Sequence, residues 1–226
     1  CDADSPRVQR AESINISIKL TQCGFDLGDA EAESRCRETV ERAHTVGTFV
    51  RIDMEASDYT DRTLDLMERV FAQRRNTGTV LQTYLYRTPK DLDRLNALGM
   101  RVRLVKGAYL EPASVAFPEK AKVDQAYVEL AETALQNANY PAFATHDEKL
   151  IETIIGLAEK HSVGRDRYEF QMLYGIRRDL QDRLLAEGYL VRVYVPFGSS
   201  WYPYFSRRLA ERPANIWFIA KSLFRR

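Results

Sequence analysis

The sequence predicts an α/β fold in which one parallel sheet closes into a barrel. Short segments rich in β-branched and aromatic residues alternate with longer amphipathic segments seven times along the 226 residues, and this alternation is typical of a parallel sheet. No turn of the G-x-G-x-x-G type follows the first predicted strand, although an open nucleotide-binding sheet carries one there. Polar residues instead stand at the ends of many different strands, where barrel enzymes carry their active-site groups.

Seven strands are expected, each short and most of them rich in Val, Ile, Phe or Tyr. In chain order they are Ile14–Leu20, Phe49–Met54, Val80–Tyr86, Val102–Lys106, Ala142–Thr145, Tyr168–Leu173 and Val191–Val195. No Gly/Ser-rich linker or charge block separates any of them from the next. We therefore expect a single domain over residues 1–226.

Apolar residues with helical spacing lie between the predicted strands. The stripes are Cys36, Val40 and Ala43; Leu64, Met67 and Phe71; Leu92, Leu95 and Leu98; Val123, Tyr127, Leu130 and Ala134; and Leu150, Ile151, Ile154 and Ile155. Thr88 and Pro89 are expected as the N-cap and first residue of one helix, and Asp147 as the N-cap of another. Gly99 and Gly188 are expected just after helix ends, because glycine adopts the left-handed conformation there easily.

Composition excludes several classes of protein. The 33 Lys and Arg residues balance 32 Asp and Glu residues, for a formal net charge of +1, so no strongly basic surface for nucleic acid is expected. The three cysteines form no C-x-x-C pair, which argues against a metal site or a disulfide framework and favours the reducing cytoplasm. The most apolar stretch, residues 216–224, contains Lys221 and is shorter than the roughly 20 residues that span a membrane.

Polar side chains interrupt all seven strands, although strands buried on both faces are normally almost continuously apolar. They are Lys19, Asp53, Glu55, Gln82, Arg103, Lys106, Thr145, His146, Glu169, Gln171 and Tyr194. A buried charge needs a partner, and an interior ion pair such as Asp53 with Arg103 explains any single case. Because the ends of barrel strands meet at one rim, the whole set predicts a polar site for a large ligand.

Two further motifs carry polar or flexible groups. Gly107 follows a strand, where it serves either a close approach of backbone to ligand or a plain turn. Tyr204, Arg207, Arg208 and Glu211 share one face of a predicted helix, and adjacent arginines suit a small carboxylate or phosphate. A solvated face with Glu211 paired to an arginine is the alternative. Since no metal-ligand spacing or nucleophile motif accompanies these groups, an organic cofactor is expected to supply the reactivity.

Seven sequence motifs occur in a fixed order between residues 16 and 224. They are IKLT at 18–21, RIDME at 51–55, VRLVKGAY at 102–109, FATH at 143–146, YEFQMLYG at 168–175, VYVP at 193–196 and RRLAE at 207–211. Together they resemble the proline dehydrogenase family, the flavin-dependent enzymes that oxidise L-proline, in its monofunctional bacterial form. The resemblance implies a distorted, TIM-like (β/α)8 barrel in which FAD lies across the strand ends and a final helix closes over proline.

The resemblance also implies a substrate site. The residues expected to bind proline are Lys19, Tyr194, Tyr204, Arg207 and Arg208. The two arginines bind its carboxylate with Lys19 beside them, and the two tyrosines pack around its ring. Glu211 pairs with the arginines, and together with Asp53 and Arg103 it completes the set implied to act in catalysis.

FAD is implied to lie against a second set of residues. Arg103 is expected beside the reactive nitrogen of the flavin, Gln82 at the isoalloxazine edge, and Asp53 beneath the ring, where it orders the charges. The rest of the cofactor site is Lys106, Gly107, Ala108, Thr145, His146 and Gln171. No metal is expected.

The expected reaction is the oxidation of L-proline to 1-pyrroline-5-carboxylate by hydride transfer to FAD, the first step of proline catabolism, with electrons passed to a quinone. Two other functions stay open: a barrel lyase or aldolase that forms a Schiff base on Lys19 or Lys106, and a carboxylate-binding module that uses Arg207 and Arg208. Apolar residues after position 216 offer a peripheral contact with the inner face of a membrane, although packing against the barrel is the favoured interpretation.

The family places another strand and helix before the strand that carries Lys19. Here only residues 1–13 precede that strand, and they show no strand pattern. We therefore expect the first strand of the barrel to be missing from this sequence, which puts barrel closure in doubt.

Overall fold

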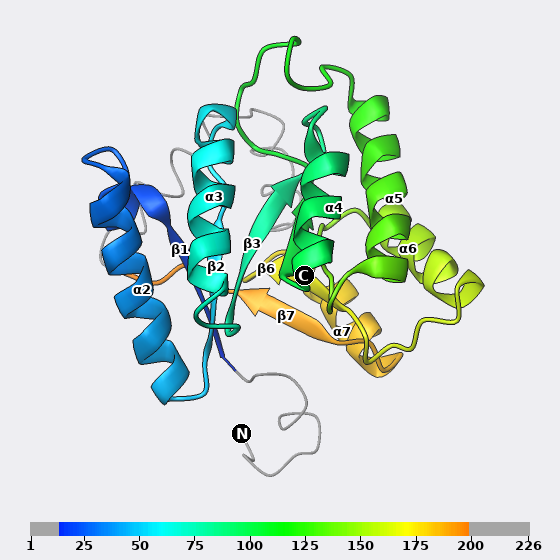
Figure 1. Ribbon diagram of the computed structural model, residues 1–226. Helices are drawn as coiled ribbons and strands as arrows, with labels where there is room; N and C mark the ends of the chain where they lie inside the picture. Colours follow the sequence, from blue (N-terminus) through cyan, green and yellow to red (C-terminus); the bar gives the residue numbers. More distant parts are fainter. Residues whose placement is uncertain (1–13, 199–226) are drawn as a thin grey trace.

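Seven parallel strands form one curled sheet in the computed structural model, which describes residues 14–198 (Figure 1). They are β1 (Asn15–Lys19), β2 (Phe49–Asp53), β3 (Thr77–Gln82), β4 (Arg101–Val105), β5 (Ala142–Ala144), β6 (Glu169–Leu173) and β7 (Val191–Tyr194). Each strand pairs with the next one in the sequence, so within the described residues β1 and β7 are the edges of the sheet. The predicted parallel α/β fold is confirmed.

Helices connect successive strands and cover the outer face of the sheet (Figure 1), since parallel strands need a crossover connection. They are α2 (Asp29–Thr45), α3 (Thr60–Phe71), α4 (Thr88–Leu98), α5 (Lys120–Asn137), α6 (Glu148–Lys160) and α7 (Arg178–Ala186), with short 3-10 turns η1 (Leu20–Cys23) and η2 (Ser57–Tyr59). The predicted apolar stripes are the buried sides of these helices, as in α6, where Leu150, Ile151 and Ile154 are buried. No helix within residues 14–198 is long and apolar enough to cross a bilayer.

Most strand ends lie within one residue of the prediction, and the elements that differ most from it are β3 and the start of α4. β3 ends at Gln82 rather than at Tyr86 and begins three residues earlier than expected, because the chain turns after Gln82 while Tyr84 and Leu85 stay buried. The predicted strand was too long at its C-terminal end because the residues after Gln82 continue to be apolar. Thr88 is the first residue of α4 rather than its N-cap, since its hydroxyl donates to the backbone oxygen of Gln82 at 2.6 Å. Gly99 does end this helix, with a φ of 70°.

The two faces of the sheet differ in chemistry. Side chains alternate between faces along a strand, and residues in register on parallel neighbours share a face. The outer face packs apolar residues such as Ile52, Leu104 and Phe170 against the helices. The register pairs Lys19 with Asp53, Val80 with Arg103, and Leu173 with Tyr194. Followed across all seven strands, it assigns the inner face to Lys19, Asp53, Gln82, Arg103, Gln171 and Tyr194.

Candidate active site

Arg103 on β4 lies at the centre of a buried polar network on the inner face. Its guanidinium forms an ion pair with Asp53 of β2, and its Nη1 donates to Oε1 of Gln171 on β6 at 3.1 Å. The guanidinium carbon lies 5.6 Å from the ring centroid of Tyr194 on β7, and the Tyr194 hydroxyl donates to Asp53 at 3.3 Å. Four strands thus bring together four of the predicted site residues.

The Asp53–Arg103 ion pair is the interior pair that the sequence offered as the simplest explanation of two polar strand residues. The two side chains are only 14% and 9% exposed, so each charge depends on the other for stability in the interior. The pairing does not satisfy the whole guanidinium, because the buried Nε of Arg103 has no hydrogen-bond partner within residues 14–198. The network therefore leaves one strong donor for a ligand.

Gln82 on β3 leaves a buried acceptor unmatched. Its Nε2 donates to the backbone oxygen of Glu55 at 3.2 Å, which fixes the orientation of the amide. Its Oε1 is buried and has no hydrogen-bond partner among the residues that the structure describes. An unmatched buried group costs roughly 1–3 kcal/mol. A flavin ring carries both an N–H donor and ring-nitrogen and carbonyl acceptors, so its chemistry fits Gln82 Oε1 and Arg103 Nε.

Lys19 ends β1 beside Asp53 in the sheet register. Its Nζ donates to the hydroxyl of Tyr109 at 3.1 Å and lies 5.8 Å from the centroid of that ring. Tyr109 follows β4, and Tyr84 donates from its own hydroxyl to the Tyr109 backbone oxygen at 3.3 Å. Tyr109 received no role in the sequence analysis, although it is the last residue of the VRLVKGAY motif, and its place in that motif was the available signal.

Lys106 lies just after β4 and bridges two helix starts. Its Nζ is 2.6 Å from Oδ1 of Asp124 on α5 and 3.1 Å from Oδ2 of Asp147, the N-cap of α6. These ion pairs tie the loop after β4 to the loop after β5. Both loops carry predicted cofactor-binding residues, so Lys106 fixes their relative position.

Gly107 continues this loop with a φ of 116°, a conformation that side-chain-bearing residues rarely adopt. A Cβ on this glycine would lie 2.4 Å from ring carbons of Tyr84. The described contact that demands glycine is therefore tight packing against Tyr84. Ala108 follows in the same loop and is partly buried.

Thr145 and His146 follow β5. Thr145 is buried, and its hydroxyl accepts a hydrogen bond from the backbone N–H of Asp147 at 3.1 Å. Nε2 of His146 accepts from the backbone N–H of Leu173 at 2.9 Å, which assigns the ring proton of the neutral form to Nδ1. Burial, with the positive charge of Arg177 added, lowers the pKa of His146 to about 4. His146 is therefore a neutral imidazole at physiological pH.

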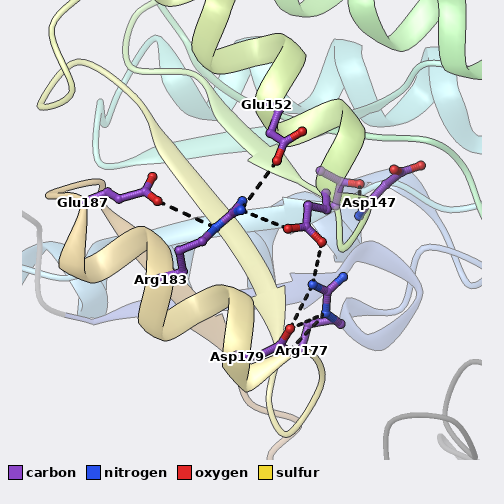
Figure 2. A network of polar contacts seen from close by, with 8 residues as sticks. Asp147, Glu152, Arg177, Asp179, Arg183 and Glu187 are labelled. Atoms are coloured by element: carbon purple, nitrogen blue, oxygen red, sulfur yellow. Dashed lines mark hydrogen bonds and ion pairs between the residues drawn. The ribbon is translucent and has the colours of Figure 1, made fainter. Parts of the chain in front are cut away.

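Ion pairs join α6 to α7 and to the residue just before α7 (Figure 2). Nη2 of Arg177, just before α7, donates to Glu148 at 2.9 Å and to Asp179 at 3.0 Å. Arg183 contacts Glu148 at 2.9 Å and Glu152 at 3.5 Å. Arg177 has a left-handed φ of 51°, which is unfavourable for a residue with a Cβ, and its two carboxylate contacts offset that cost. The network fixes the loop after β6 against the start of α6.

Comparison with known proteins identifies the family. The profile described as Proline dehydrogenase matches residues 2–221. The chain belongs to the proline dehydrogenase family. The family predicted from the motifs is thus confirmed, and with it the family's activity, the oxidation of proline to 1-pyrroline-5-carboxylate in the first step of proline catabolism.

Relatives of two lengths match the chain. It is 45% identical over 215 residues to Proline dehydrogenase of Deinococcus radiodurans, covering 93% of this chain and 69% of that one. It is 44% identical over 209 residues to Proline dehydrogenase 2 of Bacillus subtilis strain 168, covering 92% and 69%. The crystal structure of proline utilization A from Bradyrhizobium japonicum, mutant D779Y, superimposes with a TM-score of 0.80 at 27% identity, covering 92% of this chain and 25% of that chain. This chain thus spans about a quarter of that longer protein.

A second layer of charged residues lies deeper on the inner face; only Glu169 of this layer was named from the sequence, as a polar strand residue, and none of its members was given a specific role. Arg51 and Glu169 are almost fully buried, and Arg192 contacts Glu169 through both Nε and Nη2 at 2.8 Å. Burial, reinforced by the charge of Arg103, lowers the pKa of Arg51 to about 9. Each of these residues is a polar interruption two positions before a predicted site residue on its own strand, and that spacing was the signal available in the sequence.

The predicted proline-binding helix lies outside the described residues. It carries Tyr204, Arg207, Arg208 and Glu211. The apolar segment at 216–224 also lies outside them.

Proposed function

We propose that FAD is the resident cofactor of this oxidation of L-proline and that the electrons pass from it to a quinone. The observation that carries the proposal is the buried network around Arg103, which leaves a donor on Arg103 and an acceptor on Gln82 unmatched within residues 14–198. Membership of the proline dehydrogenase family supports it independently.

Arg103 and Gln82 hold the flavin ring in this proposal. When bound, FAD supplies the acceptor for the hydride. The residues that line the cofactor are Asp53, Lys106, Gly107, Ala108, Thr145, His146 and Gln171. Arg103 is already held by Asp53 and Gln171, so its positive charge is available to developing negative charge without rearrangement, as preorganised electrostatic stabilisation requires.

Proline is held by charged and aromatic side chains at the rim. Arg207 and Arg208 bind its carboxylate, with the ammonium of Lys19 beside them, while Tyr194 and Tyr204 restrict the ring. Glu211 pairs with the arginines. The hydride leaves the ring carbon next to nitrogen as the nitrogen lone pair forms the C=N bond, so the reaction depends on orientation more than on a strong acid.

The proposed quinone acceptor indicates where the reduced flavin would be reoxidised. A quinone is held in a membrane, so we propose that the protein works in the cytoplasm and contacts the inner face of the membrane peripherally. Trp217, Phe218, Ile219 and Phe224 support this proposal as apolar residues close together in the sequence. Activity with a soluble dye but not with quinone-containing vesicles would count against it.

The test of the flavin proposal is the visible spectrum of the purified protein before and after L-proline is added without oxygen. We expect a flavin band that L-proline bleaches and that pyrrolidine, which lacks the carboxylate, leaves almost unchanged. A colourless protein that cannot be reconstituted with FAD would contradict the proposal. Borohydride trapping of a carbonyl substrate on Lys19 or Lys106 would favour the lyase instead.

A further inference from the structure

We propose that Glu169 is a positioning residue for Arg103, acting through the side-chain amide of Gln171. The inference rests on the proposed function, in which Arg103 lies against the flavin. Glu169 lies one layer below the network that the flavin is proposed to contact, so it acts on Arg103 without touching cofactor or substrate.

The contacts form a continuous series of hydrogen bonds from β7 to β4. Arg192 donates through Nε and Nη2 to the Glu169 carboxylate, both at 2.8 Å. Gln171 donates through Nε2 to Glu169 Oε1 at 2.5 Å and accepts at Oε1 from Arg103 Nη1 at 3.1 Å. Glu169 and Gln171 share a face of β6 because they are two positions apart, and Gln171 is in register with Arg192 on β7.

Donor and acceptor chemistry gives this series of hydrogen bonds a direction. A guanidinium only donates and a carboxylate only accepts. Gln171 stands between one of each, so its amide satisfies both neighbours in one orientation only, with nitrogen toward Glu169 and oxygen toward Arg103. The Glu169 carboxylate therefore determines that Arg103 meets an acceptor.

Glu169 keeps its charge although it is only 2% exposed. Burial acts to raise the pKa of Glu169, but the hydrogen bonds and charge of Arg192 and the hydrogen bond from Gln171 outweigh it and leave the pKa below its ordinary value. The tie between β6 and β7 that Glu169 makes with Arg192 is a second, purely structural role. An experiment must separate the two roles.

Glu169→Gln separates the positioning role from the structural role because it removes the carboxylate, a group that only accepts hydrogen bonds. Both carboxylate oxygens accept from Arg192, and Oε1 also accepts from Gln171, so the new amide keeps its bond to Gln171 only by placing its single oxygen at the Oε1 position. A neutral amide oxygen is a weaker acceptor than a carboxylate oxygen, so Gln171 is held less firmly and Arg103 loses part of its fixed acceptor. We expect a roughly tenfold weaker preference for reduced flavin, which lowers the two-electron midpoint potential by about 30 mV. We also expect kcat to fall about tenfold while KM for proline stays within about twofold.

A double-mutant cycle supplies the decisive comparison. In a Gln171→Leu background the amide link is absent, so we expect Glu169→Gln to leave the potential and kcat unchanged. Additive effects of the two substitutions would overturn the proposal and leave only the structural role. Glu33→Gln is the matched control, since Glu33 also bridges two arginines, Arg37 and Arg69, and we expect it to change neither readout.

Two further measurements keep the result interpretable. If Glu169→Gln does not fold because Arg192 is left unpaired, Glu169→Gln/Arg192→Gln removes both charges and is tested in the same way. A crystal structure of the variant without FAD reports Arg103 directly, and Gln171 and Arg103 side chains that are as well ordered and in the same positions as in the wild type contradict the inference. Wild-type protein that binds no FAD defeats the proposed function instead, and the crystallographic result still decides the role of Glu169.

Discussion

Asp53→Asn tests how strongly the site depends on its central ion pair. Among the inner-face strand residues, Lys19, Arg51, Arg101, Arg103 and Arg192 carry five positive charges and Asp53 and Glu169 carry two negative charges, a net charge of five minus two, or +3. The substitution keeps the shape of the side chain and raises this net charge to +4. Both partners are largely buried. Arg103 therefore loses its counter-charge at a position where water cannot take the place of the carboxylate.

Removing one partner of a buried ion pair costs about 3–5 kcal/mol. For a chain of this size, each kcal/mol lowers the melting temperature by roughly 2–4 °C. We therefore expect Asp53→Asn to lower the free energy of unfolding by about 3–5 kcal/mol and to weaken FAD binding. The assay is urea unfolding of the flavin-free protein, with the free energy taken by linear extrapolation.

The control is Glu41→Gln, which breaks the exposed pair between Glu41 and Arg74. Exposed pairs contribute little to stability, so we expect no measurable change in the unfolding midpoint. An Asp53→Asn midpoint equal to that of Glu41→Gln would refute the reasoning. In Asp53→Asn/Arg103→Met the uncompensated charge is gone, and most of the lost stability should return, although FAD binding should not.

Three other predictions address single residues. Gly107→Ala is expected to destabilise the protein by more than about 1 kcal/mol, because its Cβ meets Tyr84 at a positive φ; a melting curve that matches wild type would contradict this. His146 has its pKa lowered from 6.5 to about 4, so the unfolded state takes up its proton first as pH falls, and up to about 3 kcal/mol of stability present above pH 6.5 is lost by pH 4. His146→Gln should flatten that part of the stability–pH curve, and an unchanged slope would count against the assignment. Arg208→Ala should raise KM for proline about 10- to 100-fold while FAD stays bound, as a flavin titration will report; equal loss of FAD would give Arg208 another role.

The sequence showed which strand residues were unusual because its signal is simple. A parallel strand buried on both faces should be apolar, so Asp53, Arg103 and Gln171 stood out as polar interruptions, and the meeting of barrel strand ends at one rim predicted that they would lie close together. The helix stripes were predictable for a similar reason, since helix packing selects a period of 3.6 residues. Local chemistry was sufficient for these features.

Hydrogen-bond pairing and side-chain packing were harder to predict from the sequence because they depend on residues far apart in the chain. Nothing in the sequence showed that Gln171 would stand between Arg103 and Glu169, or that Nε2 of His146 would accept a hydrogen bond from the backbone of β6. The glycine at 107 had two explanations, and only the position of the Tyr84 ring shows which contact requires it. The β3 boundary was wrong for the same reason, since tertiary burial continued after the strand had ended.

The most direct test of proline oxidation is the stoichiometry of a single anaerobic turnover. Purified protein saturated with FAD is mixed with L-proline and no other acceptor, and the bleached flavin and the released product are both quantified, the product by mass spectrometry. The account predicts one equivalent of 1-pyrroline-5-carboxylate for each flavin reduced. Reduced flavin without this product, or the product without flavin reduction, would contradict it.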